Sequence, residues 1–464
     1  MSHPQRSGAA PGRASAARSG LAAAREGLRR VRTAATTTEP GRLRVIGAGL
    51  AALLLAFGAI TAWQVSDRSA AADAVVGHSQ PLSAAAADIY RSLADADTTA
   101  ASGFLAGGKE PRAVRERYEK DIATASELLV KAAANADRAS FEHTQITRLN
   151  QQLPAYTGLV ESARANNRQG LPLGGAYLRY ASDQMRLELL PAARKLYEAE
   201  TGRLRADYRD AESWPWFALA AGVLTLGALG WAQHREYRRT NRVFSQGLLA
   251  ATAATTVALL WLTAGHGVAC ADLSGSYAHG AKSMDVLHTA RIASLQARGA
   301  ENLTLVARGA VVTGDNHDAY EESYRLNMRQ LAGDPAASAP VGGLLERART
   351  LADGRGGRDP VSRAVGFAQQ WRQRHQQERA VDDGGDYAKA LPMVIGDRDS
   401  TGESFDRVDA QLQQALDHEQ GEFRHSADDG RGALTGLAVG AAALALLGAL
   451  GVVLGIGRRL SEYR

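Results

Sequence analysis

Apolar residues are concentrated in four long stretches of the chain, and polar residues fill the segments between them. The apolar stretches lie at 45–65, 214–232, 247–268 and 433–456, and none has Lys, Arg, Asp or Glu at its centre. A helix rises ~1.5 Å per residue, so each stretch is long enough to cross a hydrocarbon core of ~30 Å. The pattern therefore predicts four transmembrane helices. Four buried helices of a globular core are the alternative, which the lengths and flanking charges disfavour.

Between these stretches the apolar positions repeat with the period of a helix. In "ITRLNQQLPAYTGLVESA" they recur every three or four residues, at Ile146, Leu149, Leu153, Tyr156 and Val160. Strand-like alternation is scarce, and Gly- and Pro-rich breaks leave about four amphipathic segments in each of 66–213 and 269–432. We therefore expect an all-α membrane protein with two extracytoplasmic four-helix bundles in tandem, each standing on two spans.

The two halves of the chain resemble each other at an offset of 202 residues. The first apolar stretch then aligns with the third. Leu93 aligns with Leu295, and "YEKD", which begins at Tyr118, aligns with "YEES", which begins at Tyr320. This register predicts an internal duplication, in which each half consists of a span, an outer domain and a second span.

Arginine is concentrated in three segments that lie on the same side of a four-span chain. They are the N-terminal tail 1–44, the loop 233–246 and the C-terminal stub 457–464, and each has more Arg than Asp and Glu. Positively charged flanks mark the cytoplasmic side of a membrane. We therefore expect a multi-pass plasma-membrane protein with both termini in the cytoplasm and outer domains at 66–213 and 269–432. The tail is expected to be largely disordered.

The formal net charge of +5 follows mostly from these arginines. It favours attraction to anionic lipid. No basic patch with interleaved aromatic residues and no nucleic-acid fold motif accompanies it. We therefore expect a lipid bilayer, and no nucleic acid, as a partner. The sequence leaves homodimer formation open.

No catalytic motif is found along the chain. It has no phosphate-binding glycine loop, no kinase catalytic loop and no nucleophile elbow. A single cysteine, Cys270, supplies neither a zinc signature nor an internal disulfide, and its role stays open. We expect no enzyme activity, no catalytic residue, no cofactor and no metal.

Two charged segments receive a structural interpretation. The segment "TGDNHDAYEE" is interpreted as a turn and a helix start capped by Asp315 or Asn316, rather than as a metal site. The run "QWRQRHQQERA" at 370–380 is interpreted as a solvated helix face, with anion binding as the alternative. Neither segment is assigned a function.

In the predicted topology, the three basic segments form the surface that a cytoplasmic partner can contact. The residues assigned to this contact are Arg235, Arg238, Arg239, Arg242, Arg458 and Arg459. Helices that run from an outer bundle into a span can carry displacements of ~1–2 Å to such a surface. Within the spans, Gly227 with Gly230 and Gly448 with Gly451 suit close helix packing, and a filler role in alanine-rich helices is the alternative.

A unit of span, helical bundle and span that ends in a basic stub such as "GIGRRLSEYR" resembles the sensory halves of chemoreceptors and histidine kinases. The duplicated four-span arrangement, the loop "HREYRRTNR" and the Ala-, Arg- and Gly-rich composition resemble, more specifically, the actinobacterial GlnX-type membrane proteins. This resemblance implies an extracytoplasmic amino-acid-binding protein and a cytoplasmic serine/threonine kinase as partners. It covers the architecture of most of the chain and assigns no binding residue.

The sequence thus indicates a non-enzymatic transmembrane signal transducer. Its outer domains would bind an extracytoplasmic solute-binding protein or a small ligand, an amino acid if the resemblance holds. Its cytoplasmic edges would contact an effector such as a serine/threonine kinase. Two other functions stay open: a structural or scaffolding protein of the cell envelope, and an accessory subunit of a transporter.

Overall fold

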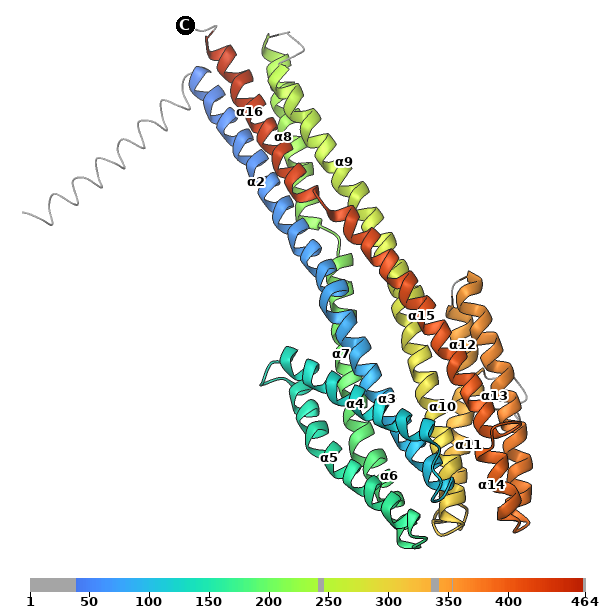
Figure 1. Cartoon of the computed structure of the whole chain (residues 1–464). Coiled ribbons are helices and arrows are strands. Elements are labelled where there is room, and N and C mark those ends of the chain that lie inside the picture. Colours follow the sequence, from blue (N-terminus) through green and yellow to red (C-terminus); the bar gives the residue numbers. More distant parts are fainter. Residues whose placement is uncertain (1–38, 241–245, 335–341, 353, 462–464) are drawn as a thin grey trace, which may run out of the picture. The chain divides into compact units, whose positions relative to one another are not determined.

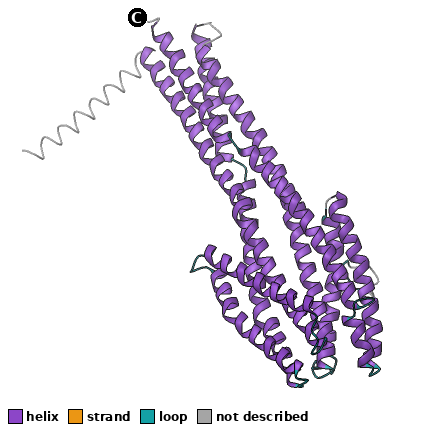
Figure 2. Cartoon of the chain, viewed as in Figure 1, coloured by secondary structure: helices purple, strands orange, loops and turns teal. Residues whose placement is uncertain are grey.

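The structure is a computed structural model that describes residues 39–240, 246–334, 342–352 and 354–461. Over these ranges almost every residue is helical and no strand occurs, apart from an isolated bridge between Val312 and Asp318 (Figure 2). The predicted all-α class is confirmed. The expected disorder of the N-terminal tail 1–44 is wrong for residues 39–44, which are helical, and residues 1–38 lie outside the described ranges.

Four helical runs are long and apolar enough to cross a membrane. They are Gly41–Leu105, Leu173–Arg238, Gln246–Gly275 and Thr401–Arg458. Each run contains one of the four apolar stretches that the sequence pattern singles out. The chain is therefore a membrane protein with four candidate spans.

The chain divides into two compact units. The first, here called the span unit, holds the residues up to 67 together with 214–267 and 434 onward. The second, here called the bundle unit, holds residues 68–213 and 268–433. We refer to these two ranges as the first and second halves of the bundle unit.

Four helices supply the span unit (Figure 1): α2 (Glu39–Ala74), α8 (Trp216–Thr240), α9 (Gln246–Gly275) and α16 (Leu437–Ser461). They share a buried aliphatic core that includes Leu50, Leu229, Leu248 and Val452. Large apolar side chains also lie on the outside of this unit, and Leu454 is 68% exposed. Helices that are apolar all round are typical of membrane spans.

Glycines allow close contact between α9 and α16. A Cβ atom added to Gly247 would lie 2.1 Å from the carbonyl oxygen of Gly451, and one added to Gly448 would touch Leu54 at 3.4 Å. One added to Gly451 would lie 3.1 Å from the carbonyl oxygen of Gly247, so the predicted close-packing role is confirmed for Gly451, whereas the contact at Gly448 is an ordinary one. The same expectation is wrong for Gly227 and Gly230, because a Cβ atom at either position would meet no described atom within 4 Å.

The first half of the bundle unit contains two π-helical turns and five α-helices. They are η1 (Val75–Ser79), α3 (Gln80–Leu105), α4 (Arg112–Asn135), α5 (Phe141–Arg168), α6 (Leu173–Gln184), η2 (Met185–Leu189) and α7 (Leu190–Glu212). The periodic apolar residues of α5 are all buried, as the spacing predicts. Ser140 caps this helix, because its hydroxyl accepts a hydrogen bond from the backbone N–H of His143 at 3.1 Å.

The second half has more elements than expected. Its described residues form η3 (Ser276–Ala281), α10 (Lys282–Ala307), α11 (Ala319–Ala332), α12 (Leu344–Leu351), α13 (Gly354–Asp383), α14 (Tyr387–Ile395) and α15 (Thr401–Leu434). The short helices α12 and α14 lie between Gly- and Asp-rich turns that the sequence pattern counts only as breaks. About four segments were expected in this half.

The start of α11 also corrects a sequence expectation. Asp318 is the N-cap, and its carboxylate accepts hydrogen bonds from the backbone N–H groups of Tyr320 at 2.8 Å and Glu321 at 3.0 Å. Asn316 instead adopts a left-handed backbone conformation with φ of 61°. Asn tolerates that conformation better than most residues, so it forms the turn before the helix and does not cap it.

Helices α3 and α10 join the two halves. They have 26 residues each, and both their first and their last residues are 202 positions apart. The amide of Asn302 donates hydrogen bonds to the backbone oxygen of Thr98 at 3.2 Å and to the hydroxyl of Ser102 at 2.7 Å. The hydroxyl of Thr98 donates to the backbone oxygen of Leu295 at 3.0 Å. Both helices are buried along most of their length.

The glycine contact in the span unit can be tested with a single methyl group. Gly247→Ala is expected to lower the stability of the full chain by about 1–3 kcal/mol, because α9 and α16 must separate to accept the Cβ atom. Gly230→Ala is the matched control, and it should leave stability unchanged or raise it slightly, since alanine favours helix more than glycine does. Thermal unfolding in lipid nanodiscs measures both. Equal effects of the two substitutions would contradict the assignment.

Candidate functional site

The arginines assigned to a cytoplasmic contact lie at helix ends in the span unit. Arg235 and Arg238 are in the last turns of α8, and Arg458 is near the end of α16. The guanidinium of Arg235 lies 5.5 Å from the ring centre of Trp231. Arg238 and Arg458 are exposed.

The remaining three arginines are described only in part. The side chains of Arg239 and Arg459 are not described, although both residues belong to these helices, and Arg242 lies outside the described residues. The common core of Leu229 and Ile456 places the two helix ends together. The contact with a partner stays a prediction.

A groove runs along the bundle unit between α7 and α10. Its first part, the Asp97 cavity, has a volume of about 180 Å³ and is lined from α3, η2, α10 and α11. Its second part, the Tyr197 cavity, has a volume of about 410 Å³ and lies between α7 and α10. Gln296 lines both cavities, so the two are adjacent. The groove therefore draws on both halves of the bundle unit.

Asp97 is a buried carboxyl group at the edge of the Asp97 cavity. Its two oxygens accept hydrogen bonds from Ser182 Oγ at 2.7 Å and from Tyr156 OH at 3.3 Å. Burial raises the pKa of Asp97 to about 6, and the hydrogen bond from Ser182 and the charge of Arg186 limit the rise. Each carboxylate oxygen can accept a second hydrogen bond, so Asp97 keeps the capacity to bind a ligand.

Arg186 supplies a positive charge to the same cavity. It lies in η2, its guanidinium is 5.0 Å from the ring centre of Tyr320, and it donates a hydrogen bond to Asp183. The polar side chains of Gln296, Ser323 and Asn327 also line the cavity. The cavity thus combines a carboxyl group, a guanidinium cation and neutral hydrogen-bonding groups.

Each of the three helices that line most of the groove is preceded by a π-helical turn. These turns are η1 before α3, η2 before α7 and η3 before α10. Single π turns inside longer helices occur frequently at functional sites. Nothing in the apolar periodicity indicates these π-helical turns. The sequence pattern also assigns no role to Asp97 or Arg186. A signal was present in α3, where Asp97 interrupts an alanine-rich helix.

Ion pairs also join the halves. Arg117 of α4 contacts Asp95 of α3 at 2.9 Å and Asp406 of α15 at 3.3 Å. Nη2 of Arg117 also lies 4.0 Å from Oδ2 of Asp409, which Arg291 of α10 binds within the second half. The first half is therefore held to the second by charged groups as well as by the α3–α10 hydrogen bonds.

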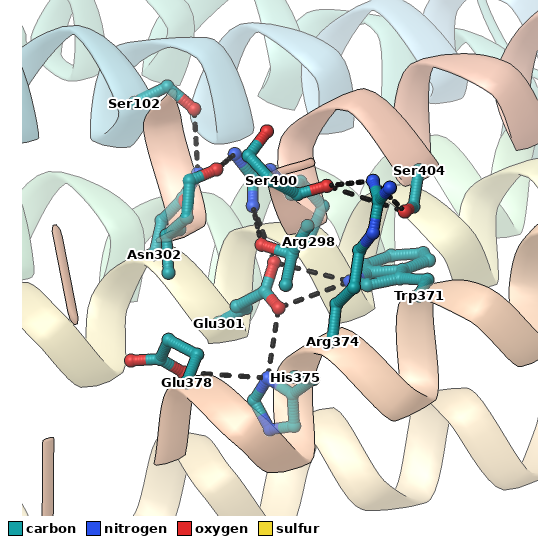
Figure 3. Close-up of polar contacts among 12 residues, drawn as sticks. Ser102, Arg298, Glu301, Asn302, Trp371, Arg374, His375, Glu378, Ser400 and Ser404 are labelled. Carbon is teal, nitrogen blue, oxygen red and sulfur yellow. Dashed lines mark hydrogen bonds and ion pairs between the residues drawn. The ribbon is translucent and has the colours of Figure 1, made fainter. Parts of the chain in front are cut away.

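A buried ionic cluster lies within the second half, between α10, α11 and α13 (Figure 3). We call it the His375 cluster. Glu301 is 1% exposed and accepts hydrogen bonds from Arg298 and from Trp371 Nε1, the latter at 3.1 Å. His375 Nδ1 lies 2.9 Å from Glu301, and Nε2 lies 3.0 Å from Glu321. Tyr324 stacks on the imidazole ring, with the ring centres 3.6 Å apart.

The geometry requires a doubly protonated imidazole. Burial opposes the charge on His375, but the hydrogen bonds to Glu301 and Glu321 outweigh it and raise the pKa of the imidazole to about 9. Burial likewise opposes ionisation of Glu301, and the Arg298 charge and His375 lower the pKa of that carboxyl below its usual value. Two ionised carboxylates can only accept, so both ring nitrogens donate.

The His375 cluster overturns the interpretation of 370–380 as a solvated face. Trp371, His375 and Glu378 of α13 are all buried. They are spaced four and three residues apart, which puts them on one side of a helix. That spacing was the signal in the sequence, and the surrounding Arg and Gln residues obscured it.

The described residues offer no group of three or more His, Cys, Asp or Glu side chains that could hold a metal ion. Cys270 is half-buried. The groove combines charges and hydrogen-bonding groups with a cavity of limited size, an arrangement suited to binding a small polar molecule.

The raised pKa of His375 makes the stability of the second half depend on pH. Its stabilising charge is fully present below 6.5, the ordinary histidine value, and is lost as the pH rises through about 9. We expect the full chain to lose about 3 kcal/mol across this window, and His375→Gln to abolish most of that dependence. The exposed His425 gives the control, His425→Gln. Hydrogen exchange of α10 and α13 measures the loss, and an unchanged pH profile in His375→Gln would contradict it.

Part of the chain matches a known protein family. No curated protein and no solved structure matches the chain. Residues 71–209 match the model of a protein family described as an actinobacterial sensor domain. The matched range contains η1 to α7 except the end of α7, and therefore holds both Asp97 and Arg186. The first half of the bundle unit is similar to a sensor domain, and the chain has a sensing or signalling role.

Proposed function

We propose that the chain is a non-enzymatic transmembrane sensor that binds a small zwitterionic solute, such as an amino acid, in the Asp97 cavity. The observation that carries the proposal is the charged cavity itself, whose two charged residues, Asp97 and Arg186, both lie in the region similar to a sensor domain. The bound solute would shift the helices that line the groove. That shift would pass through the spans to a cytoplasmic effector.

The two charges of the cavity match the two charges of an amino acid. Arg186 can pair with a carboxylate, since the planar guanidinium suits two parallel hydrogen bonds. Asp97 can accept from an ammonium group, and a bound cation would lower the pKa of its carboxyl and stabilise the ionised form. Pockets for drug-sized molecules have ~300–1,000 Å³. The volume of about 180 Å³ favours a smaller solute.

The groove helices are connected along the chain to candidate spans. The run Gly41–Leu105 includes α2, η1 and α3, and the run Leu173–Arg238 includes η2, α7 and α8. Helix α10 follows α9 with η3 between them. Small displacements of such helices bias two-state outputs in signalling proteins. This connectivity supports transmission from the groove.

The finer parts of the proposal rest on sequence features. The groove would be extracytoplasmic, the termini cytoplasmic, and the arginines at the ends of α8 and α16 would contact the effector. The GlnX-type resemblance favours a serine/threonine kinase as that effector and an extracytoplasmic solute-binding protein as a second partner. The equal length and 202-residue offset of α3 and α10 support an internal duplication.

Cysteine labelling tests the orientation. In a Cys270→Ser background, Tyr180→Cys places a thiol at a 66% exposed position of the bundle unit, and Tyr237→Cys places one at a 48% exposed position near the end of α8. A membrane-impermeant maleimide should label Tyr180→Cys on intact cells and Tyr237→Cys only after permeabilisation. The reverse result would show that the termini are outside.

Ligand-induced stabilisation tests the groove. In nanodiscs, the full chain should gain ~2.7 kcal/mol in stability at a solute concentration of ~100 Kd. Individual amino acids are the probes. Arg186→Gln and Asp97→Asn should both lose the gain, whereas Arg112→Gln, at a side chain that is 91% exposed on α4, should keep it.

Two results would contradict direct binding. Equal stabilisation of Arg186→Gln and of the unmodified chain would show that the ligand binds elsewhere. Stabilisation by none of the amino acids would remove direct amino-acid sensing. A scaffolding role would then be the stronger candidate, unless a purified solute-binding protein associates with the chain in the presence of its own ligand.

A further inference from the structure

Glu378 is buried in the His375 cluster without a close positive partner. Its exposed fraction is 1%, and within the described ranges no donor reaches its Oε1 atom. Its Oε2 atom lies 3.9 Å from His375 Nδ1, which is too far for a hydrogen bond. That nitrogen donates to Glu301 instead, at 2.9 Å. Figure 3 shows Glu378 beside His375 on the same helix, α13.

The cations inside the cluster are already used. Arg298 donates to Glu301, to Thr401 Oγ1 at 3.0 Å and to the backbone oxygen of Val394 at 2.9 Å. The imidazole of His375 is shared between Glu301 and Glu321. A negatively charged Glu378 would be a third buried carboxylate beside two cations. An uncompensated buried charge is costly, and a bound proton removes it.

Charged and titratable groups of three helices surround Glu378. The groups whose charge acts on it are Glu301 of α10 and His375, Arg379 and Asp382 of α13, and Tyr324 of α11 lies beside it. Arg379 is the nearest further cation on the same helix. It is engaged by Asp382 at 2.6 Å and by Asp383, so it compensates Glu378 only in part.

We propose that Glu378 is a proton-binding site, at which uptake and release of one proton alters the packing of α13 against α10. Burial, followed by the charge of Glu301, raises the pKa of Glu378 to about 7. Release of the proton places a negative charge 3.9 Å from the imidazole that Glu301 already holds. Glu378 then competes with Glu301 for His375 Nδ1–H.

The competition affects the groove through α10. Glu301 is flanked on this helix by Gly299, Ala300 and Leu303, which line the Asp97 cavity. A change in the hydrogen bonding of Glu301 therefore acts on a wall of the groove. The chain would sense pH as an input of its own, whether or not the groove binds an amino acid.

Trp371 provides a local reporter for this proton. It is the only one of the six tryptophans in the bundle unit, and its Nε1–H donates to Glu301. In the full chain in nanodiscs, with the other five tryptophans replaced by Phe, the emission of Trp371 should titrate with a midpoint near 7. Glu378→Gln should abolish this transition. Glu322→Gln, at a partly exposed acid of α11, should keep it.

The outcomes separate the proposal from a purely structural role. A titration that persists unchanged in Glu378→Gln, or no titration in the parent chain, would overturn the proposal. If Glu378→Gln does not fold, infrared difference spectra of the unmodified chain decide instead. An isotopically substituted glutamate is introduced at position 378 alone by nonsense suppression. Its protonated carboxyl band should disappear as the pH rises through the neutral range. A band that is absent or constant would overturn the proposal equally.

Discussion

The packing of α3 against α10 is the contact on which the bundle unit depends. Both helices are buried along most of their length, and α4, α7, α11 and α12 each pack against one of them. Their mutual contact relies on small side chains and on hydrogen bonds from Thr98 and Asn302. A buried amide without a partner is costly, so these bonds fix the register of one helix against the other. The groove depends on that register, because residues of both α3 and α10 line it.

The same two helices each carry buried charged side chains, and each half satisfies that charge differently. In the first half Asp97 relies on neutral hydroxyl groups, which leaves its carboxyl only partly compensated. In the second half Glu301 is surrounded by Arg298, Trp371 and His375. Buried ionic groups are weak sources of stability and are better understood as devices that select one arrangement. The first half thus keeps a carboxyl group that can accept further hydrogen bonds, whereas the ionic cluster of the second half holds its helices together.

The sequence predicts the large features because they depend on repeated, local patterns. Four spans and the buried stripe of α5 follow from hydrophobic period, and the contact of Gly451 follows from the smallness of glycine. It does not predict features that depend on contacts between distant residues. The burial of Trp371, His375 and Glu378 depends on packing against α10. Glu301 of that helix, some seventy positions earlier in the chain, forms hydrogen bonds with Trp371 and His375. Asp97 and Arg186 share a cavity only because η2 and α3 lie together. The placement of α12 and α14 likewise has no periodic signal.

The π-helical turns have a consequence for how the faces of each long helix are arranged. A π turn contains an extra residue, so the side chains that follow it are advanced by about 100° around the axis relative to an unbroken α-helix. In the sequences α2–η1–α3 and α9–η3–α10, this phase step falls between the apolar stretch and the groove-lining residues. The two portions of each helix therefore have separate angular phases. Insertion or deletion of one residue at these turns would rotate the side chains of one portion around the helix axis relative to those of the other portion.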